Sequence, residues 1–226
     1  MTESTAADTL PSPADTLPDS TADAPQGARK GKSRPAKNDV LPVLEQLAAL
    51  YPALFGAQFL PLKRGIFQDL QDAHPEVFER EALKAALSMH TRSTRYLSVV
   101  SSGQQRHDLE GKPVEAMAPE HVHHALLEVF RRRHARSNED LRPKLRQRMV
   151  QAFEASGLSA VDYATLVRSK DDEANALLDE ALAEAQARSA KNEALQRAYA
   201  SSGKSVDAFA DMYGLDPQAV ARLLAR

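Results

Sequence analysis

HTRSTRYL, residues 90–97, is the stretch on which the prediction of this fold depends. Its hydroxyl residues Thr91 and Ser93 stand just before a short apolar run, where N-cap residues accept an otherwise unpaired backbone N–H. We therefore expect a short helix to begin here. Its free N–H groups and partial positive charge would suit a phosphate, and Arg92 and Arg95 add full charges beside it. An ordinary capped helix with surface arginines is the alternative interpretation.

Apolar residues on both sides of this stretch recur at helical spacing. They predict helices over residues 40–50, 63–73 and 75–89, and one more that begins at Pro119, a favourable first-turn position for proline. Two glycines bracket residues 104–110, which suit a β-strand and a turn better than a helix. The pattern therefore predicts a mainly α domain with a short β-hairpin.

The rest of the chain is almost entirely helical by the same criterion. Helices are predicted over residues 141–155, 159–167 and 171–200. The last stretch, residues 205–226, is a short helix, a turn with glycine and a second helix. Ala210, Gly214 and Val220 stand where a helix-turn-helix DNA reader needs a small residue, a turn glycine and an apolar residue. A plain helical hairpin needs the same three positions.

The first 37 residues differ in composition from everything that follows. Residues 1–26 carry only acidic charge and almost no large apolar side chains, so we expect disorder there. Residues 29–37 are abruptly basic, which suits either an arm that follows a phosphate backbone or a solubilising linker. The predicted domains are a disordered tail over 1–37, a folded domain over 38–136 and a helical C-terminal region over 137–226.

The overall composition of the chain limits the cellular compartment and the kinds of chemistry that we expect for the protein. The chain has no cysteine, which excludes disulfides and thiolate catalysis and favours a reducing compartment. We find no apolar run long enough to cross a membrane and no signal-peptide pattern at the start, so we expect a cytoplasmic protein. The net charge of -2 does not discriminate between partners, so the distribution of charge matters more than its sum.

A metal site or an active site is not predicted. Glu120, His121, His123 and His124 are the nearest to a ligand cluster, but His123 points away from the helical face shared by the other two histidines. Phosphate-loop glycines and an activated serine or cysteine nucleophile are not visible. We therefore predict a protein without catalytic residues, metal or cofactor.

Four segments follow one another in a fixed order around the opening stretch. They are PLKRGIFQDL at 61–70, ALKAAL at 82–87, HTRSTRYL at 90–97 and GQQRHDLEG at 103–111. The series resembles the ProQ/FinO family of bacterial RNA-binding domains, from about Val40 to about Val129. The resemblance implies a compact ProQ/FinO-like helical domain with a short β-hairpin, followed here by an extended all-α C-terminal region.

The resemblance also implies an RNA-binding site. In this family RNA lies across a concave basic face, and the bound element is typically a terminator-like hairpin with a single-stranded 3′ end. The positions that match the family's site or stand within it are Lys63, Arg80, Lys84, His90, Thr91, Arg92, Ser93, Arg95, Tyr96 and Arg106. His90 stands where family members often carry Tyr, and its ordinary pKa near neutrality leads us to expect a pH-sensitive contact with the last nucleotides.

The functional prediction is an RNA chaperone that binds small RNAs and messenger 3′ terminator hairpins in bacterial post-transcriptional regulation. Spread Lys and Arg residues suit duplex RNA, which proteins recognise by shape, phosphates and 2′-hydroxyls. The alternative is a DNA-binding regulator that uses the terminal helical hairpin. It predicts a preference for duplex DNA and a dependence on Arg222.

Overall fold

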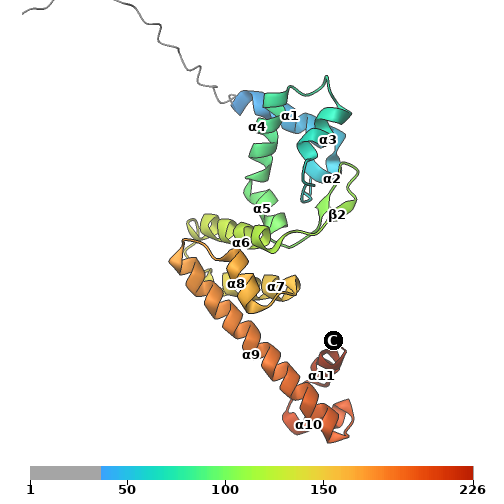
Figure 1. Ribbon diagram of the computed structural model, residues 1–226, viewed down its shortest axis with the longest axis vertical. Coiled ribbons are helices and arrows are strands. Elements are labelled where there is room, and N and C mark those ends of the chain that lie inside the picture. The colour runs from blue at the N-terminus through green and yellow to red at the C-terminus, as the bar shows by residue number, and fades with distance from the viewer. Residues whose placement is uncertain (1–36, 226) are drawn as a thin grey trace, which may run out of the picture. The chain divides into compact units, whose positions relative to one another are not determined.

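Residues 37–225 are described by a computed structural model and form eleven helices and one β-hairpin (Figure 1). The elements of the first part are α1 (Lys37–Leu50), α2 (Pro52–Phe55), α3 (Ile66–Ala73), α4 (Arg80–Thr91), α5 (Thr94–Val100), β1 (Arg106–His107), β2 (Pro113–Glu115) and α6 (Pro119–His134). The elements that follow are α7 (Arg142–Ser156), α8 (Ala160–Val167), α9 (Asp172–Ser202), α10 (Val206–Tyr213) and α11 (Pro217–Leu224). The predicted mainly α fold is confirmed, whereas the predicted disorder of residues 1–36 lies outside the described residues.

Backbone conformation explains where two helices begin later than predicted. α3 begins at Ile66 rather than residue 63, because Gly65 before it has a φ of 82°, in the left-handed region that glycine tolerates. α4 begins at Arg80 rather than residue 75, because the Glu79 carboxylate accepts the backbone N–H groups of Glu81 and Ala82 and caps the helix there.

The turn between α4 and α5 uses one of the two expected capping hydroxyls. Ser93 is the N-cap of α5, and its Oγ accepts the backbone N–H of Tyr96 at 3.1 Å. Thr91 is still part of α4, where its Oγ1 donates to the Leu87 carbonyl at 2.8 Å. The expectation that Thr91 caps α5 is therefore wrong, and Thr91 secures the last turn of the preceding helix.

Leu62 joins α5 to the β-hairpin. β1 and β2 are antiparallel with Arg106 opposite Glu115, and Leu62 forms a parallel bridge with His107. The Leu62 backbone N–H donates to the Tyr96 hydroxyl at 3.0 Å, and its carbonyl accepts from Arg106 Nη1 at 3.0 Å. Both backbone groups of this buried residue are thus satisfied by side chains from different elements.

One cluster of buried side chains extends from the first helices into the C-terminal region. It includes Leu47 and Leu70 as well as Leu126 of α6, Leu145 of α7 and Leu177 of α9. The predicted boundary between residues 136 and 137 falls in the connection between α6 and α7, and α6 packs on both α5 and α7. The division into domains at this point stays a prediction.

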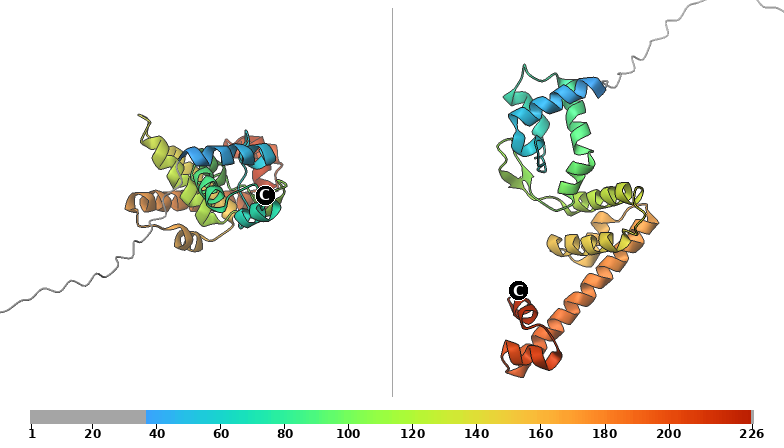
Figure 2. Two further views of the ribbon diagram at one scale, coloured as in Figure 1. Left: turned by 90° about the horizontal axis from the view of Figure 1, so that it is seen from above. Right: turned by 180° about the vertical axis from the view of Figure 1, so that it is seen from behind.

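The long helix α9 runs from the region of α7 and α8 to that of α10 and α11, as Figures 1 and 2 show, and its two ends belong to different hydrophobic cores. Near its start, Leu178 and Leu182 pack against Tyr163 and Val167 of α8. Near its end, its side chains cover Phe209, Ala210 and Val220 of α10 and α11. Residues 186–191 between these cores are all exposed.

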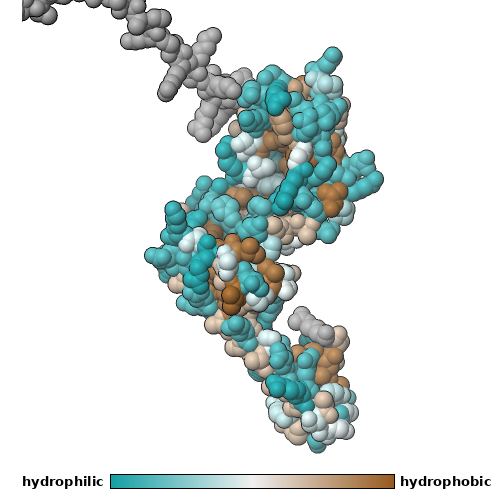
Figure 3. All heavy atoms as spheres, in the orientation of Figure 1, coloured by the Kyte–Doolittle hydropathy of each residue, from teal (hydrophilic) through white to brown (hydrophobic). Residues whose placement is uncertain are grey.

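The surface is mostly hydrophilic on the face shown in Figure 3, with an apolar patch over the region of α7 and α8. Among the side chains of α8, Val161 is 75% exposed and Leu166 is also exposed. Among the helices that the structure describes, none combines the length and the apolar character needed to cross a membrane.

The Leu62 contact generates a prediction about stability. Tyr96→Phe should lower the free energy of unfolding by about 1–3 kcal/mol, because the buried Leu62 N–H loses its acceptor. Urea unfolding followed by circular dichroism measures the change. Tyr213→Phe is the control, because Tyr213 is half exposed and its hydroxyl makes no hydrogen bond within residues 37–225. An equal effect of the two changes would contradict the role given to the Tyr96 hydroxyl.

Candidate nucleic-acid interface

The turn between α4 and α5 rests on a buried histidine. His90 is 5% exposed, and its ring packs against Phe55, Phe59 and Tyr96 with centroids 4.8, 4.3 and 5.2 Å away. Burial lowers the pKa of His90 to about 4, and the nearby Arg95 charge acts in the same direction. The imidazole is therefore neutral near pH 7. The expected contact that strengthens on protonation near neutrality is wrong for this conformation, in which His90 supports the turn from inside.

Two other predicted site residues also direct their polar groups inward. Tyr96 is buried, its hydroxyl holds the Leu62 N–H, and burial raises the pKa of its phenol. The Arg106 side chain is only 13% exposed, donates to the Leu62 carbonyl, and lies 3.6 Å from Glu115 through Nε. Their positions make them supports of the surface above them.

The exposed cations of the predicted set lie on α4 and at the start of α5. Lys84 and Arg92 are exposed and stand eight residues apart, with Ser88 between them, so they follow one side of α4. Arg95 is exposed, stacks over the Phe59 ring at 4.4 Å and donates to the Ala57 carbonyl. In the part of the chain that the structure describes, these three cations have no carboxylate at ion-pairing distance.

Arg80 and Lys63 flank this group and differ in charge compensation. Arg80 is exposed, lies over the Phe67 ring at 5.7 Å and has no ion-pairing carboxylate within residues 40–225. Lys63 is half-buried and pairs with Asp69 at 2.8 Å. That hydrogen bond raises the pKa of Lys63 despite some desolvation. Lys63 is therefore partly neutralised, whereas Arg80 retains its full charge for a ligand.

α6 contributes an arginine that the sequence-based site did not include. Arg132 Nη1 donates to the Arg92 carbonyl at 2.8 Å and to Thr94 Oγ1 at 3.2 Å, so it binds both sides of the α4–α5 turn. Its Nη2 atom lies 3.5 Å from the carboxylate of Glu128, which stands one helical turn earlier. The basic string of residues 131–133 was a visible signal, but its contact with a turn 40 residues away was not.

The histidines of α6 do not converge. His123 is buried against the Tyr163 ring, with centroids 6.2 Å apart, whereas His121 and His124 are exposed. Burial, with a smaller effect of His124, lowers the pKa of His123 to about 4. Within residues 37–225, no three His, Asp or Glu side chains gather closely enough to hold a metal ion.

In the terminal hairpin, two of the three motif positions pack in a core and the third forms the turn. Ala210 and Val220 are buried in the small core beneath α9, and Gly214 has a φ of 63° that ends α10. Arg222, on which the DNA-binding alternative depends, lies 3.6 Å from Asp216, the N-cap of α11. The hairpin is thus built as a packed helical pair, with its exposed arginine next to a carboxylate.

A comparison with known protein families identifies the family of this domain. The ProQ/FINO family matches residues 37–142, from the start of α1 to the start of α7. Residues 37–142 are a ProQ/FinO family domain. The resemblance that the four ordered segments indicated is therefore confirmed, and none of the comparisons favours the DNA-binding alternative.

Several individual proteins are similar to part of this chain. RNA chaperone ProQ from Aeromonas salmonicida and from Aeromonas hydrophila are each 40% identical over 87 residues, which are 37% of this chain and 41% of each relative. The similarity thus spans about two fifths of the length of these curated relatives. Among solved structures, a ProQ homologue from Legionella pneumophila is 32% identical, covers 47% of this chain and 93% of its own, and has a TM-score of 0.37. A FinO-like RNA chaperone from Neisseria meningitidis is 28% identical, with 40% and 93% covered and a TM-score of 0.36.

The buried imidazole of His90 predicts a loss of stability in acid. The unfolded chain takes up this proton near pH 6.5, but the folded protein only near pH 4. The contribution is therefore present above about pH 6.5 and is lost as the pH falls towards 4, by on the order of 3 kcal/mol at most. His90→Phe keeps an aromatic ring without the titration and should reduce the dependence, while the buried His123 keeps its own share of it; urea unfolding at several pH values measures the change.

A suitable control for the loss of one imidazole is His121→Gln at an exposed position of α6. This variant should keep the acid sensitivity of the original protein. If His90→Phe kept that full sensitivity as well, the assignment of the effect to His90 would be refuted.

Proposed function

We propose that this protein is an RNA-binding protein and an RNA chaperone. The observation that carries the proposal is the set of exposed cations without ion-pairing carboxylates, Arg80, Lys84, Arg92 and Arg95, on α4 and α5 of a ProQ/FinO domain. Cations that are not neutralised internally are available for RNA phosphates, and their binding gains free energy from the release of counterions. The curated relatives named RNA chaperone ProQ support the same class of activity.

The proposed interface has an outer and an inner part. Arg80, Lys84, Arg92 and Arg95 would bind phosphates directly, and Lys63 would join them at one edge. Tyr96, His90 and Arg106 would hold the turn and the Leu62 segment beneath them. Thr91 and Ser93 would keep the ends of α4 and α5 in place.

The proposed ligands are small RNAs and messenger RNAs with terminator-like hairpins and single-stranded 3′ ends, bound in the bacterial cytoplasm. This follows the family resemblance and the charge pattern. α5 has only seven residues, so the partial charge at its start is small beside the full charges of Arg92 and Arg95. We propose binding without catalysis and without a cofactor.

Removal of single cations tests the proposed face. Lys84→Gln, Arg92→Gln and Arg95→Gln should each weaken binding to a synthetic terminator hairpin by about three- to tenfold, and reduce the salt slope by about one. Fluorescence anisotropy at several salt concentrations measures both quantities. Arg142→Gln is the matched control, because Arg142 pairs with Glu173 at 2.7 Å and should change binding little. Affinities unaltered by all three changes would remove α4 and α5 from the interface.

The 3′ end of the RNA gives an independent test. Binding should fall when a 3′-phosphate replaces the free 3′-hydroxyl, and fall again when the single-stranded tail is removed, because the strand end would lie at Arg92 and Arg95. A hairpin with the additional phosphate at its 5′ end controls for added charge. Equal affinity for free and blocked 3′ ends would leave only shape and charge as the basis of recognition.

A further inference from the structure

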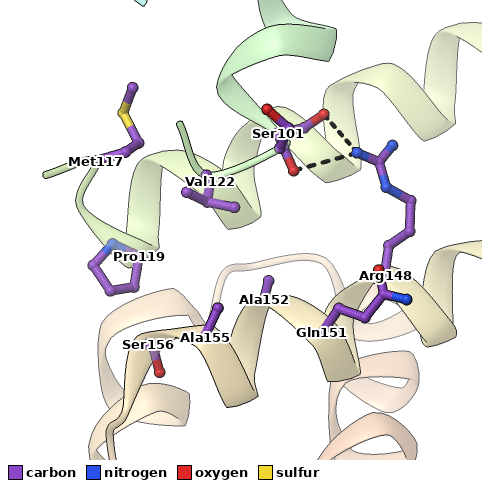
Figure 4. A pocket seen from close by; sticks show the side chains of 11 residues that line it. Ser101, Met117, Pro119, Val122, Arg148, Gln151, Ala152, Ala155 and Ser156 are labelled. Atoms are coloured by element: carbon purple, nitrogen blue, oxygen red, sulfur yellow. Dashed lines mark hydrogen bonds between the residues drawn. The ribbon is translucent and has the colours of Figure 1, made fainter. Parts of the chain in front are cut away.

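The basic residues of α7 fall into two rows with different environments. Arg142 and Arg146 face α9, where Arg142 pairs with Glu173 at 2.7 Å and Arg146 lies 3.2 and 3.1 Å from Glu180 and Glu184. Arg148 faces the other way and donates to the Ser101 carbonyl at 3.3 Å and to Ser101 Oγ at 3.0 Å (Figure 4). The charges towards α9 are thus neutralised, and the charge towards α5 is not.

α5 presents a row of hydroxyl groups to this second row of cations. Thr94, Ser98 and Ser101 stand at helical spacing along one side of α5, a rise of about 10 Å. Each is reached by an arginine from a later helix. The contacts are Arg132 with Thr94 at 3.2 Å, Arg133 with Ser98 at 3.5 Å and Arg148 with Ser101 at 3.0 Å. Neutral hydroxyl groups orient guanidinium groups without cancelling their charge.

Arg133 and Arg148 lie close enough to repel each other. Burial lowers the pKa of Arg148, and the Arg133 charge lowers it further. Within residues 40–225, neither guanidinium has a carboxylate at ion-pairing distance. Both line a cavity of about 160 Å³ between α6 and α7, together with Lys144, and Lys144 has only Glu139 beside it at 3.5 Å.

Arg148 also borders open space on its other side. It lines a second cavity of about 370 Å³ with Ser101, Gln151 and the apolar side chains of Met117 and Val122 (Figure 4). Arg148 is therefore partly exposed beside this cavity. An anion placed here would relieve the repulsion from Arg133, so the free protein carries a charge arrangement that favours a negatively charged ligand.

We propose that Arg133, Lys144 and Arg148 form a second phosphate-binding site for the same RNA, built by α5, α6 and α7. The inference rests on the proposed RNA binding and extends it beyond the ProQ/FinO match, which ends at residue 142. The hydroxyl row of α5 links the two surfaces, because Arg132 contacts Thr94 at its start and Arg133 and Arg148 contact Ser98 and Ser101 further along. The hydroxyl groups hold the cations in a row, and cations in a row suit the repeating phosphates of a nucleic-acid strand. The ligand is therefore the RNA backbone rather than a base.

The test uses the full chain and a synthetic RNA hairpin with single-stranded extensions at both ends. Arg133→Gln with Arg148→Gln should weaken binding about tenfold near 0.1 M salt and reduce the salt slope by about two. Arg148→Lys, which keeps the charge, should retain most of the slope. Arg146→Gln is the matched control, since it removes the same charge from the same helix where Glu180 and Glu184 already neutralise it.

Thermal unfolding separates binding from folding. Arg133→Gln should not lower the unfolding temperature, because it removes a like charge near Arg148 rather than an ion pair. An affinity and salt slope of the double variant equal to those of Arg146→Gln, with hairpin binding by the original chain intact, would overturn this site alone. Absence of salt-dependent hairpin binding by the original chain would overturn the proposed function and this site with it.

Discussion

Leu62 is the point on which the proposed RNA-binding surface depends. Its N–H and its carbonyl are both buried, and each finds its partner in a side chain, the hydroxyl of Tyr96 and the guanidinium of Arg106. A buried backbone group without a partner costs free energy comparable to a lost hydrogen bond. The two contacts therefore hold α5 and the β-hairpin against the same extended segment. The exposed cations of α4 and α5 are positioned by this arrangement, although none of them takes part in it.

Local pattern was enough to predict most of the helices and the family. Ser93 caps α5 as predicted, because capping depends on residues close in sequence. The direction of individual side chains was less predictable. His90, Tyr96 and Arg106 are polar residues within a basic stretch, and spacing alone does not reveal that their polar groups meet aromatic rings or the Leu62 backbone. Those partners come from other elements of the fold.

The distribution of charge explains why the net charge was uninformative. α9 carries carboxylates that neutralise Arg142 and Arg146, whereas Arg133 and Arg148 donate to the uncharged groups of Ser98 and Ser101. The sum of these charges is the same whichever cation is neutralised. For Arg142 and Arg146 the neutralising carboxylates lie more than 30 positions away, and sequence patterns do not resolve contacts at that separation.

The exposed middle of α9 determines how the α10–α11 pair is rotated about the helix axis relative to the start of α9. Each residue of an α-helix advances the axis by about 1.5 Å and turns it by about 100°. Residues 186–191 touch neither the core at the start of α9 nor the one at its end, yet they join both through a single helical backbone. One inserted residue there would rotate the α10–α11 pair by about 100° while every buried contact survived. The length of this exposed stretch thus sets the direction in which the terminal pair faces, independently of its stability.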